Sequence, residues 1–407
     1  MEDWGGGPAT GRTGRTGRRC DPASGPVRPV AGRGPVRRAA VLAVGLVTLA
    51  TVGTACSSSG STAPPTTAVP TASTGTTPSS APPVPSAGCS IPVAPVATGP
   101  LTNQRENIEV DGASRWYLLN LPATTTPSPV PVVAGSPGRP RPLVIDFHGL
   151  AEGATIHSDT TGFGTLGQQD GFIAVFPNGT GSPVHWDTTA QTGNQDLDFV
   201  SAMLQQLEST QCIDTSRVYA SGFSDGSFFV SLLACTMSNR FAAIAAVSGL
   251  QLDKPCRTTR PVPILTFHGT ADPILYFNGG IGTGTLDKVL GSKSPAGSGT
   301  SGSTTTTTLP KADLHGPGYP ATVQAWAVKD GCDPHSTDTR QSSQVIVRRY
   351  ACPAGTDVEF YIVLGGGHAW PGSAFSREIS SLTGFTTFQI DATHTIWSFF
   401  QRFTLPS

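Results

Sequence analysis

The pentapeptide Gly222-Phe223-Ser224-Asp225-Gly226 constrains the fold of this chain more than any other stretch. It follows a strand-like run, residues 217–221, and precedes an apolar helix-like run, residues 228–234. Glycine two residues before and after the serine is required where a turn leaves no room for a Cβ. The pattern predicts a tight strand-to-helix turn that exposes the Ser224 hydroxyl, with backbone N–H groups of the helix directed toward it.

The first 56 residues have the composition of an export signal. Residues 1–40 carry eight arginines against three acids, and Arg37-Arg38 directly precedes a nearly all-apolar run, residues 39–52. That run is shorter than the roughly 20 residues that span a bilayer, and a basic flank is typical of a secretory signal. Ala55-Cys56 resembles a bacterial lipoprotein signal, although Gly53 stands where an aliphatic residue is usual. We expect export, with a lipid on Cys56 that anchors the chain to the membrane; cleavage with release, or an uncleaved anchor, are the alternatives.

The next segment, residues 57–100, is predicted to be a disordered tether. Its first part, residues 57–88, consists of Ser, Thr, Pro, Ala and Gly with almost no charge or large apolar side chains, so it cannot bury enough surface to fold. Beyond residue 40 the chain has 18 basic and 24 acidic residues, which leaves no basic surface for nucleic acid. We expect one folded domain, residues 101–407, that is a monomer and contains a flexible Gly/Ser/Thr-rich insertion at 281–318.

Cysteine usage fits an oxidising compartment. Six cysteines lie beyond the leader, and fifteen pairings of six are possible. Proximity in sequence favours Cys235–Cys256 and Cys332–Cys352, which leaves Cys89–Cys212.

Short apolar runs alternate with runs of helical spacing along the folded part. Residues 108–110 and 114–119 flank Asp111-Gly112, which predicts a β-hairpin. Further strands are predicted at 143–147, 172–176, 217–221, 241–247, 262–267, 345–350 and 358–363, and helices at 196–208, 228–234, 321–330 and 391–403. This alternation predicts an α/β fold with a mostly parallel central sheet covered by helices on both faces.

The chain supplies the partners that a serine nucleophile needs. Asp272 follows the predicted strand 262–267, and His368 follows the predicted strand 358–363 after three glycines. Ser, Asp and His in this order, each after a strand, is the arrangement of the α/β-hydrolase fold. The backbone N–H groups of Leu150 and Asp225 are the candidate donors of an oxyanion hole.

Three segments resemble the polyhydroxybutyrate depolymerase/feruloyl esterase-like family of secreted α/β-hydrolases. They are Gly222 to Gly226, His268-Gly269-Thr270-Ala271-Asp272, and Gly366-Gly367-His368-Ala369-Trp370-Pro371-Gly372. The resemblance implies hydrolysis of polymer-linked or aryl carboxylic esters, such as polyhydroxybutyrate, feruloyl or acetyl esters. Asp225 departs from the Asn that the family usually has after its serine, and Ser227 from a frequent Gly. A carboxylate beside the oxyanion hole would oppose the negative charge that develops there unless it points away.

The expected chemistry is acyl transfer through a covalent intermediate on Ser224, with His368 as base, Asp272 orienting it, and no metal or cofactor. Trp186 and Trp370 are candidate substrate-binding residues, although a buried pair of His185 and Trp186 is equally compatible with the sequence. The acid could also be Asp253 or Asp287, whereas His148 and His268 are expected to be structural. A peptidase or acyltransferase with the same triad, and a non-catalytic surface binding module, are the competing functions.

Overall fold

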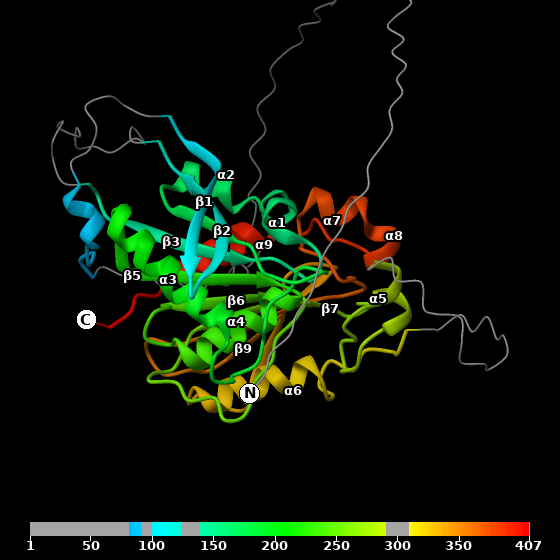
Figure 1. The fold of residues 1–407 in the computed structure, drawn as a ribbon. Helices are drawn as coiled ribbons and strands as arrows, with labels where there is room; N and C mark the ends of the chain where they lie inside the picture. The colour runs from blue at the N-terminus through cyan, green and yellow to red at the C-terminus, as the bar shows by residue number, and fades with distance from the viewer. Residues whose placement is uncertain (1–80, 92–98, 124–137, 290–308, 407) are drawn as a thin grey trace, which may run out of the picture. The chain divides into compact units, whose positions relative to one another are not determined.

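The computed structural model describes residues 81–91, 99–123, 138–289 and 309–406, all within one unit, Ala72–Ser407 (Figure 1). The described strands form one ten-stranded sheet in the order β1-β2-β4-β3-β5-β6-β7-β10-β9-β8. Their bounds are β1 Leu101–Val110, β2 Ala113–Leu121, β3 Arg141–Phe147, β4 Ile173–Pro177, β5 Ile213–Phe223, β6 Ala243–Val247, β7 Ile264–Gly269, β8 Ser336–Arg340, β9 Val345–Tyr350 and β10 Val358–Val363.

The described helices lie between and after these strands. They are η1 Ala87–Ser90, α1 Gly153–Thr161, α2 Phe163–Asp170, α3 Gln195–Thr210, α4 Asp225–Thr236, α5 Thr283–Val289, α6 Tyr319–Lys329, α7 Ala374–Glu378, α8 Ser380–Thr383 and α9 Ala392–Phe400. None of the helices in the described ranges is long and apolar enough to cross a membrane.

The centre of the sheet is parallel and its edges are antiparallel. Strands β4, β3, β5, β6, β7 and β10 pair in parallel, while β1-β2 and β9-β8 form antiparallel edges. Successive residues of β3 enter different cores: Ile145 packs in the cluster with α3, α4 and α6, and Val144 in the cluster with α1, α2 and α9. The predicted α/β fold with a mostly parallel, doubly covered sheet is therefore confirmed.

Most predicted elements are present, with shifted ends. The hairpin around Asp111-Gly112 pairs Val110 with Ala113, as the turn residues predicted. The closing helix ends at Phe400 instead of residue 403, and the edge strand β8 was not predicted because its sequence, STDTR, is entirely polar.

The N-terminal boundary of the folded domain was predicted too far along the chain. Within the segment expected to be a tether, residues 81–91 pack against the start of β5: the Val84 amide donates to Asp214 Oδ1 at 2.9 Å, and the Ser86 amide to Ile213 O at 2.8 Å. Cys89 is bonded to Cys212. Large apolar side chains are scarce there, so these backbone contacts and the disulfide order it. The export signal and Cys56 lie outside the described residues.

The predicted insertion, residues 281–318, is only partly described. Its beginning forms α5, and its end is fixed by Asn278, whose Nδ2 donates to Asp313 O at 2.7 Å and to Pro317 O at 2.9 Å. The described ends of the insertion are therefore built into the domain, while residues 290–308 lie outside the described part.

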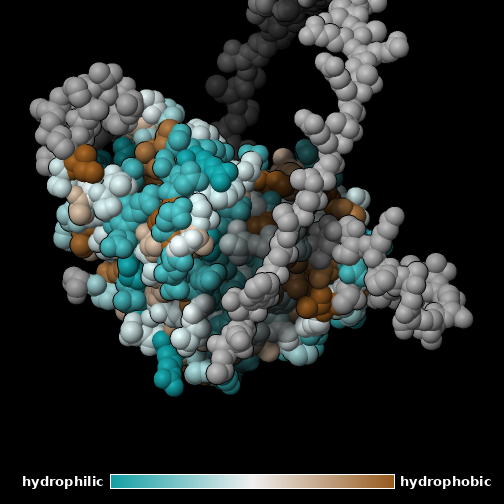
Figure 2. All heavy atoms as spheres, in the orientation of Figure 1, coloured by the Kyte–Doolittle hydropathy of each residue, from teal (hydrophilic) through white to brown (hydrophobic). Residues whose placement is uncertain are grey.

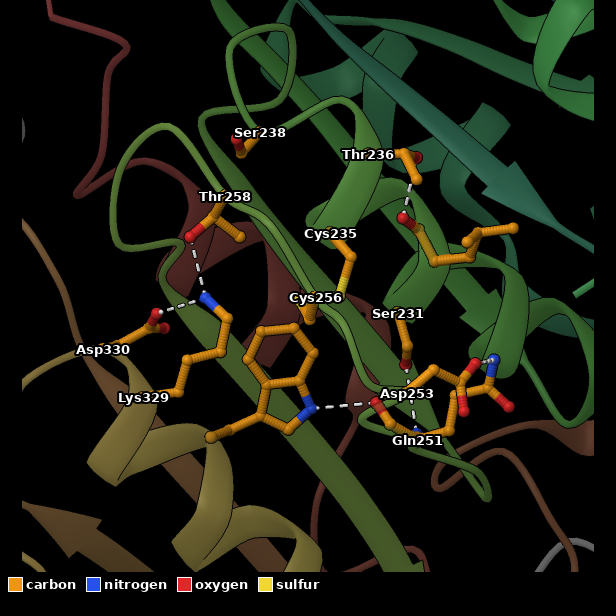
Figure 3. The surroundings of a disulfide bond; sticks show 12 residues. Ser231, Cys235, Thr236, Ser238, Gln251, Asp253, Cys256, Thr258, Lys329 and Asp330 are labelled. Atoms are coloured by element: carbon orange, nitrogen blue, oxygen red, sulfur yellow. Dashed lines mark hydrogen bonds and ion pairs between the residues drawn. A yellow bond between two sulfur atoms is a disulfide. The ribbon is translucent and has the colours of Figure 1, made fainter. Parts of the chain in front are cut away.

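All three expected disulfides are confirmed: Cys89–Cys212, Cys235–Cys256 and Cys332–Cys352. Figure 3 shows that Cys235–Cys256 ties α4 to the loop before β7. In the same loop, Thr258 Oγ1 accepts a hydrogen bond from Lys329 Nζ at 2.8 Å. The backbone amide of Gln251, also in this loop, donates to Ser231 Oγ on α4 at 3.3 Å. These contacts fix the helix that begins directly after Ser224.

Candidate active site

Ser224 lies on the turn between β5 and α4 in a strained conformation. Its φ of 54° and ψ of −114° lie outside the regions that side-chain-bearing residues favour, and its amide donates to Val247 O at 2.9 Å. A Cβ on Gly222 would lie 2.3 Å from Gly226 O, and one on Gly226 would lie 2.1 Å from Phe147 O. Both glycines are needed because backbone atoms occupy the space, as the pentapeptide predicted.

His368 and Asp272 are brought together from the ends of two neighbouring strands. Asp272 follows β7 and His368 follows β10, and His368 Nδ1 lies 2.8 Å from Asp272 Oδ2. The other oxygen, Oδ1, accepts the amides of Ile274 and Leu275, each at 2.8 Å. Burial alone would raise the pKa of Asp272, but His368 and these donors hold that pKa below its ordinary value. Asp272 is thus kept as a carboxylate that orients the imidazole.

The glycines before His368 serve close packing and not only flexibility. A Cβ on Gly367 would lie 2.2 Å from Thr383 O, and one on Gly269 would lie 2.2 Å from Gly366 O. The His368 amide donates to Thr383 O at 2.6 Å, so the loop is fixed against α8. The imidazole is therefore held in place by its backbone as well as by Asp272.

Ser224 and His368 line one cavity of about 320 Å³. Leu150, Glu152 and Asp225 line the same cavity, which contains no lysine or arginine among its described lining residues. The remaining wall is largely apolar and is formed by Leu275, Ile156, Phe228, Ile274, Ile281, Leu286, Phe375 and Ile379, together with a few small residues. Apolar surface continues outside: Ile156 and Ile281 are exposed, and Figure 2 shows hydrophobic surface near α7 and α8.

The two candidate oxyanion donors come from two different segments of the chain, the loop after β3 and the start of α4. Asp225 is the first residue of α4, where amides have no partner within the helix. In the loop after β3, the amides that flank Leu150 are both occupied: Gly149 donates to Glu152 Oε2 and Ala151 to Val184 O, each at 2.8 Å. The loop is thus fixed on both sides of the Leu150 amide.

The carboxylate of Asp225 is turned toward the loop before α3. Its Oδ2 accepts the Trp186 amide at 2.8 Å. Burial, with a smaller contribution from the charge of Asp196, raises the pKa of Asp225 to about 6, although the Trp186 amide and His185 oppose this. The side chain therefore changes charge near neutral pH, one residue from Ser224.

Trp186 and Trp370 do not line the cavity, so their predicted role in substrate contact is corrected. Trp186 is 3% exposed, stacks on Phe229 and donates from Nε1 to His148 O at 2.9 Å. Trp370 is 1% exposed and donates from Nε1 to Thr393 Oγ1 at 3.0 Å. Both indoles bury their apolar surface in the core and satisfy their N–H there.

Three further sequence candidates, Asp253, His148 and His268, have other partners. Asp253 is exposed and accepts from Gln251 Nε2, whereas the carboxylate that contacts His368 Nδ1 is that of Asp272. His148 accepts the Gly179 amide at Nε2, and His268 lies 2.9 Å from Leu275 O; burial lowers the pKa of each to about 4. As expected, both histidines are structural.

Two residues near the site were missed by the sequence reading, Glu152 and His157. Glu152 lines the cavity, and the fully buried His157 contacts the Glu152 carboxylate. The only sequence signal was an acid shortly after His148-Gly149-Leu150, which is too common to single out. In the described ranges no three His, Cys, Asp or Glu side chains are grouped as they would be around a metal ion.

Comparisons with known proteins find similarity to hydrolases and esterases. Residues 164–254, which include Ser224 but neither Asp272 nor His368, match the prolyl oligopeptidase family. The chain is 29% identical over 325 residues to the putative esterase NocK of Nocardia uniformis subsp. tsuyamanensis, covering 73% of this chain and 83% of that protein. Over most of its length the chain is therefore similar to an esterase.

Two fungal relatives match over shorter segments of this chain. The bifunctional acetylxylan esterase/xylanase XynS20E of Neocallimastix patriciarum is 35% identical over 136 residues, 33% of this chain and 20% of that protein. Feruloyl esterase B of Piromyces equi is 26% identical over 239 residues, 56% of this chain and 39% of that protein. The chain thus spans less than half the length of either fungal relative.

Proposed function

We propose that this protein is an exported serine carboxylic ester hydrolase that uses Ser224, His368 and Asp272. The observation that carries the proposal is the joint geometry of three strand ends. Ser224 is strained on its turn, Asp272 contacts His368 Nδ1 at 2.8 Å, and Ser224 and His368 line one cavity. This combination is the arrangement of a nucleophile, a base and an orienting acid.

In the proposed reaction, His368 Nε2 takes the Ser224 proton while the hydroxyl oxygen attacks the ester carbonyl. Asp272 holds Nδ1–H and stabilises the imidazolium. The Leu150 and Asp225 amides donate to the oxyanion, each lowering the barrier enough for roughly 10²- to 10³-fold in rate. The protonated His368 then donates to the leaving alcohol. Water, activated by the same imidazole, attacks the acyl-enzyme and frees the acid.

The proposed substrates are neutral esters with an apolar acyl or aryl group, either polymer-linked or phenolic. The cavity wall is mostly aliphatic and aromatic, and its described lining holds Glu152 and Asp225 but no cation. The relatives' names include acetylxylan and feruloyl esterases, which fits uncharged acyl groups. Polyhydroxybutyrate is a third candidate of the same kind.

We further propose that the chain is exported, carries a lipid at Cys56 that attaches it to the outer face of the membrane, and acts as a monomer. Arg37-Arg38, the apolar run 39–52 and Cys56 support the export and the lipid anchor. Incorporation of labelled palmitate in the parent that is lost in Cys56→Ala is the expected result; persistence in the variant would refute lipidation at this residue.

The second candidate is a peptidase, which the match of residues 164–254 to the prolyl oligopeptidase family favours. An acyltransferase would use the same triad with an alcohol in place of water, and a non-catalytic binding module would keep the fold without turnover. The full chain, produced in a host that exports it and forms disulfides, separates these functions. We expect turnover of p-nitrophenyl butyrate that is lost in Ser224→Ala, and no cleavage of prolyl-p-nitroanilide peptides. Equal turnover of p-nitrophenyl butyrate by the parent and by Ser224→Ala would refute the proposal.

A further inference from the structure

A buried network of charged residues lies beneath the loop that carries Leu150. His157, on α1, is fully buried: its Nε2 lies 3.2 Å from Asp146 Oδ2, and its Nδ1 lies 3.1 Å from Glu152 Oε2. Burial alone would lower the pKa of His157, but the two carboxylates raise it to about 10. His157 is therefore a cation at neutral pH, held between β3 and the loop.

Glu152 connects this network to the loop backbone. Its Oε2 accepts the Gly149 amide at 2.8 Å in addition to contacting His157, and its Oε1 accepts the Thr160 hydroxyl at 2.9 Å. The side chain is 11% exposed, so these bonds form largely away from water. Moving Glu152 would release the amide next to Leu150.

The Glu152 carboxylate also lies close to the candidate nucleophile. A Cβ placed on Gly149 would be 3.3 Å from Glu152 Oε2 and 3.3 Å from Ser224 Cβ. An uncompensated carboxylate at this position would oppose the negative charge of a tetrahedral intermediate, because few waters screen it. His157 supplies a positive charge that is shared between Glu152 and Asp146 and offsets part of this effect.

We infer that Glu152 and His157 are positioning residues of the oxyanion hole. His157 orients Glu152 and offsets part of its charge, and Glu152 fixes the Gly149-Leu150 backbone at the distance from Ser224 that the oxyanion needs. This role rests on the proposed ester hydrolase function, because Glu152 and His157 would support the oxyanion loop of that site.

The test compares Glu152→Ala with Glu152→Gln in the full chain. Alanine removes the acceptor of the Gly149 amide, whereas the glutamine amide oxygen can still accept it. With p-nitrophenyl butyrate we expect Glu152→Ala to lower kcat by about 10²-fold, with KM within about threefold, since the loss of one oxyanion donor has this size. The kcat of Glu152→Gln is expected to be at least tenfold higher than that of Glu152→Ala. His157→Gln is expected to lower kcat at least tenfold relative to the parent.

A transition-state analogue separates positioning from general destabilisation. An aryl trifluoromethyl ketone forms a tetrahedral adduct on the serine, so its inhibition constant should increase with the loss in kcat. Tyr219→Phe, which removes a buried hydrogen bond to Phe403 O, is the control that lowers stability at a site remote from the loop. The inference is wrong if Glu152→Ala keeps kcat within twofold of the parent, or if its inhibition constant does not rise.

Amide hydrogen exchange over residues 147–156 provides a readout that does not depend on turnover. We expect faster exchange in Glu152→Ala than in the parent or in Glu152→Gln. If the parent does not hydrolyse esters, the proposed function fails, and exchange alone still tests the support of the loop by Glu152. Unchanged exchange in Glu152→Ala would overturn that support whether or not the protein is an esterase.

Discussion

The Asp225 carboxylate accepts the Trp186 amide at 2.8 Å, so the backbone of a neighbouring loop holds the acid that follows Ser224. Asp225 contributes a backbone amide to the proposed oxyanion hole and a titratable side chain to the same cavity. The sequence raised the concern that this carboxylate opposes catalysis. The hydrogen bond to Trp186 holds one carboxylate oxygen against the neighbouring loop. Because the pKa of Asp225 is about 6, the repulsion between its carboxylate and the oxyanion depends on pH.

Asp225→Asn is predicted to increase activity most at alkaline pH. As pH rises through about 6, Asp225 becomes ionised and its charge opposes the oxyanion, whereas asparagine stays neutral and its oxygen can still accept the Trp186 amide. The ratio of kcat/KM, variant to parent, should be near 1 at about pH 5 and rise to about fivefold at about pH 8.

The same variant has a predicted effect on stability. The folded-state pKa of Asp225 is above its ordinary value of 3.8, so the folded chain binds this proton more tightly than the unfolded chain. The free energy of unfolding therefore falls in the parent as pH rises from about 4 to about 6, and this component is absent in Asp225→Asn. Urea titrations at several pH values measure it. For the activity prediction, a ratio of kcat/KM between Asp225→Asn and the parent that is constant with pH would contradict an electrostatic effect of Asp225.

Asp272→Asn is predicted to lower kcat on the order of 10⁴-fold with little change in fold. Asparagine can present its NH₂ to His368 Nδ1, which favours the wrong imidazole tautomer and removes the charge that stabilises the imidazolium. Steady-state kinetics with p-nitrophenyl butyrate measure the effect. Asp253→Asn, at the exposed acid that the sequence also allowed, is the matched control and should retain parental kcat.

The central features of the fold and site could be predicted because local sequence determines them. The turn at Ser224 needs glycines because an added Cβ would lie within 2.3 Å of backbone atoms, and the buried strand 143–147 is apolar except for Asp146. Glu152 and His157 could not be predicted, because their contact depends on how α1 packs over β3. Trp186 was misplaced since an indole fits a cleft and a core equally well by sequence.

Removal of the Cys89–Cys212 disulfide is predicted to lower stability while leaving kcat unchanged. The bond closes a sequence separation of 123 residues, and losing such a cross-link typically costs about 2–4 kcal/mol. Cys212 precedes β5 and Ser224 follows it, so the bond and the nucleophile lie at opposite ends of one strand. Denaturant unfolding and kinetics of Cys89→Ala/Cys212→Ala test both parts. A loss of kcat in the folded variant would show that residues 81–91 influence the site.

Discrimination against acidic acyl groups is predicted from the charges of the cavity. Burial alone would raise the pKa of Glu152, but His157 and the Gly149 and Thr160 donors hold that pKa below its ordinary value, so Glu152 stays ionised. Asp225 is ionised above about pH 6. A second carboxylate on the substrate would enter a largely apolar pocket without a basic partner among the described lining residues, which is costly. At about pH 8, p-nitrophenyl butyrate should therefore exceed p-nitrophenyl hemisuccinate in kcat/KM by more than about tenfold. Asp225→Asn should narrow this gap. Comparable rates for the two esters in the parent would mean that the acyl group does not enter this cavity.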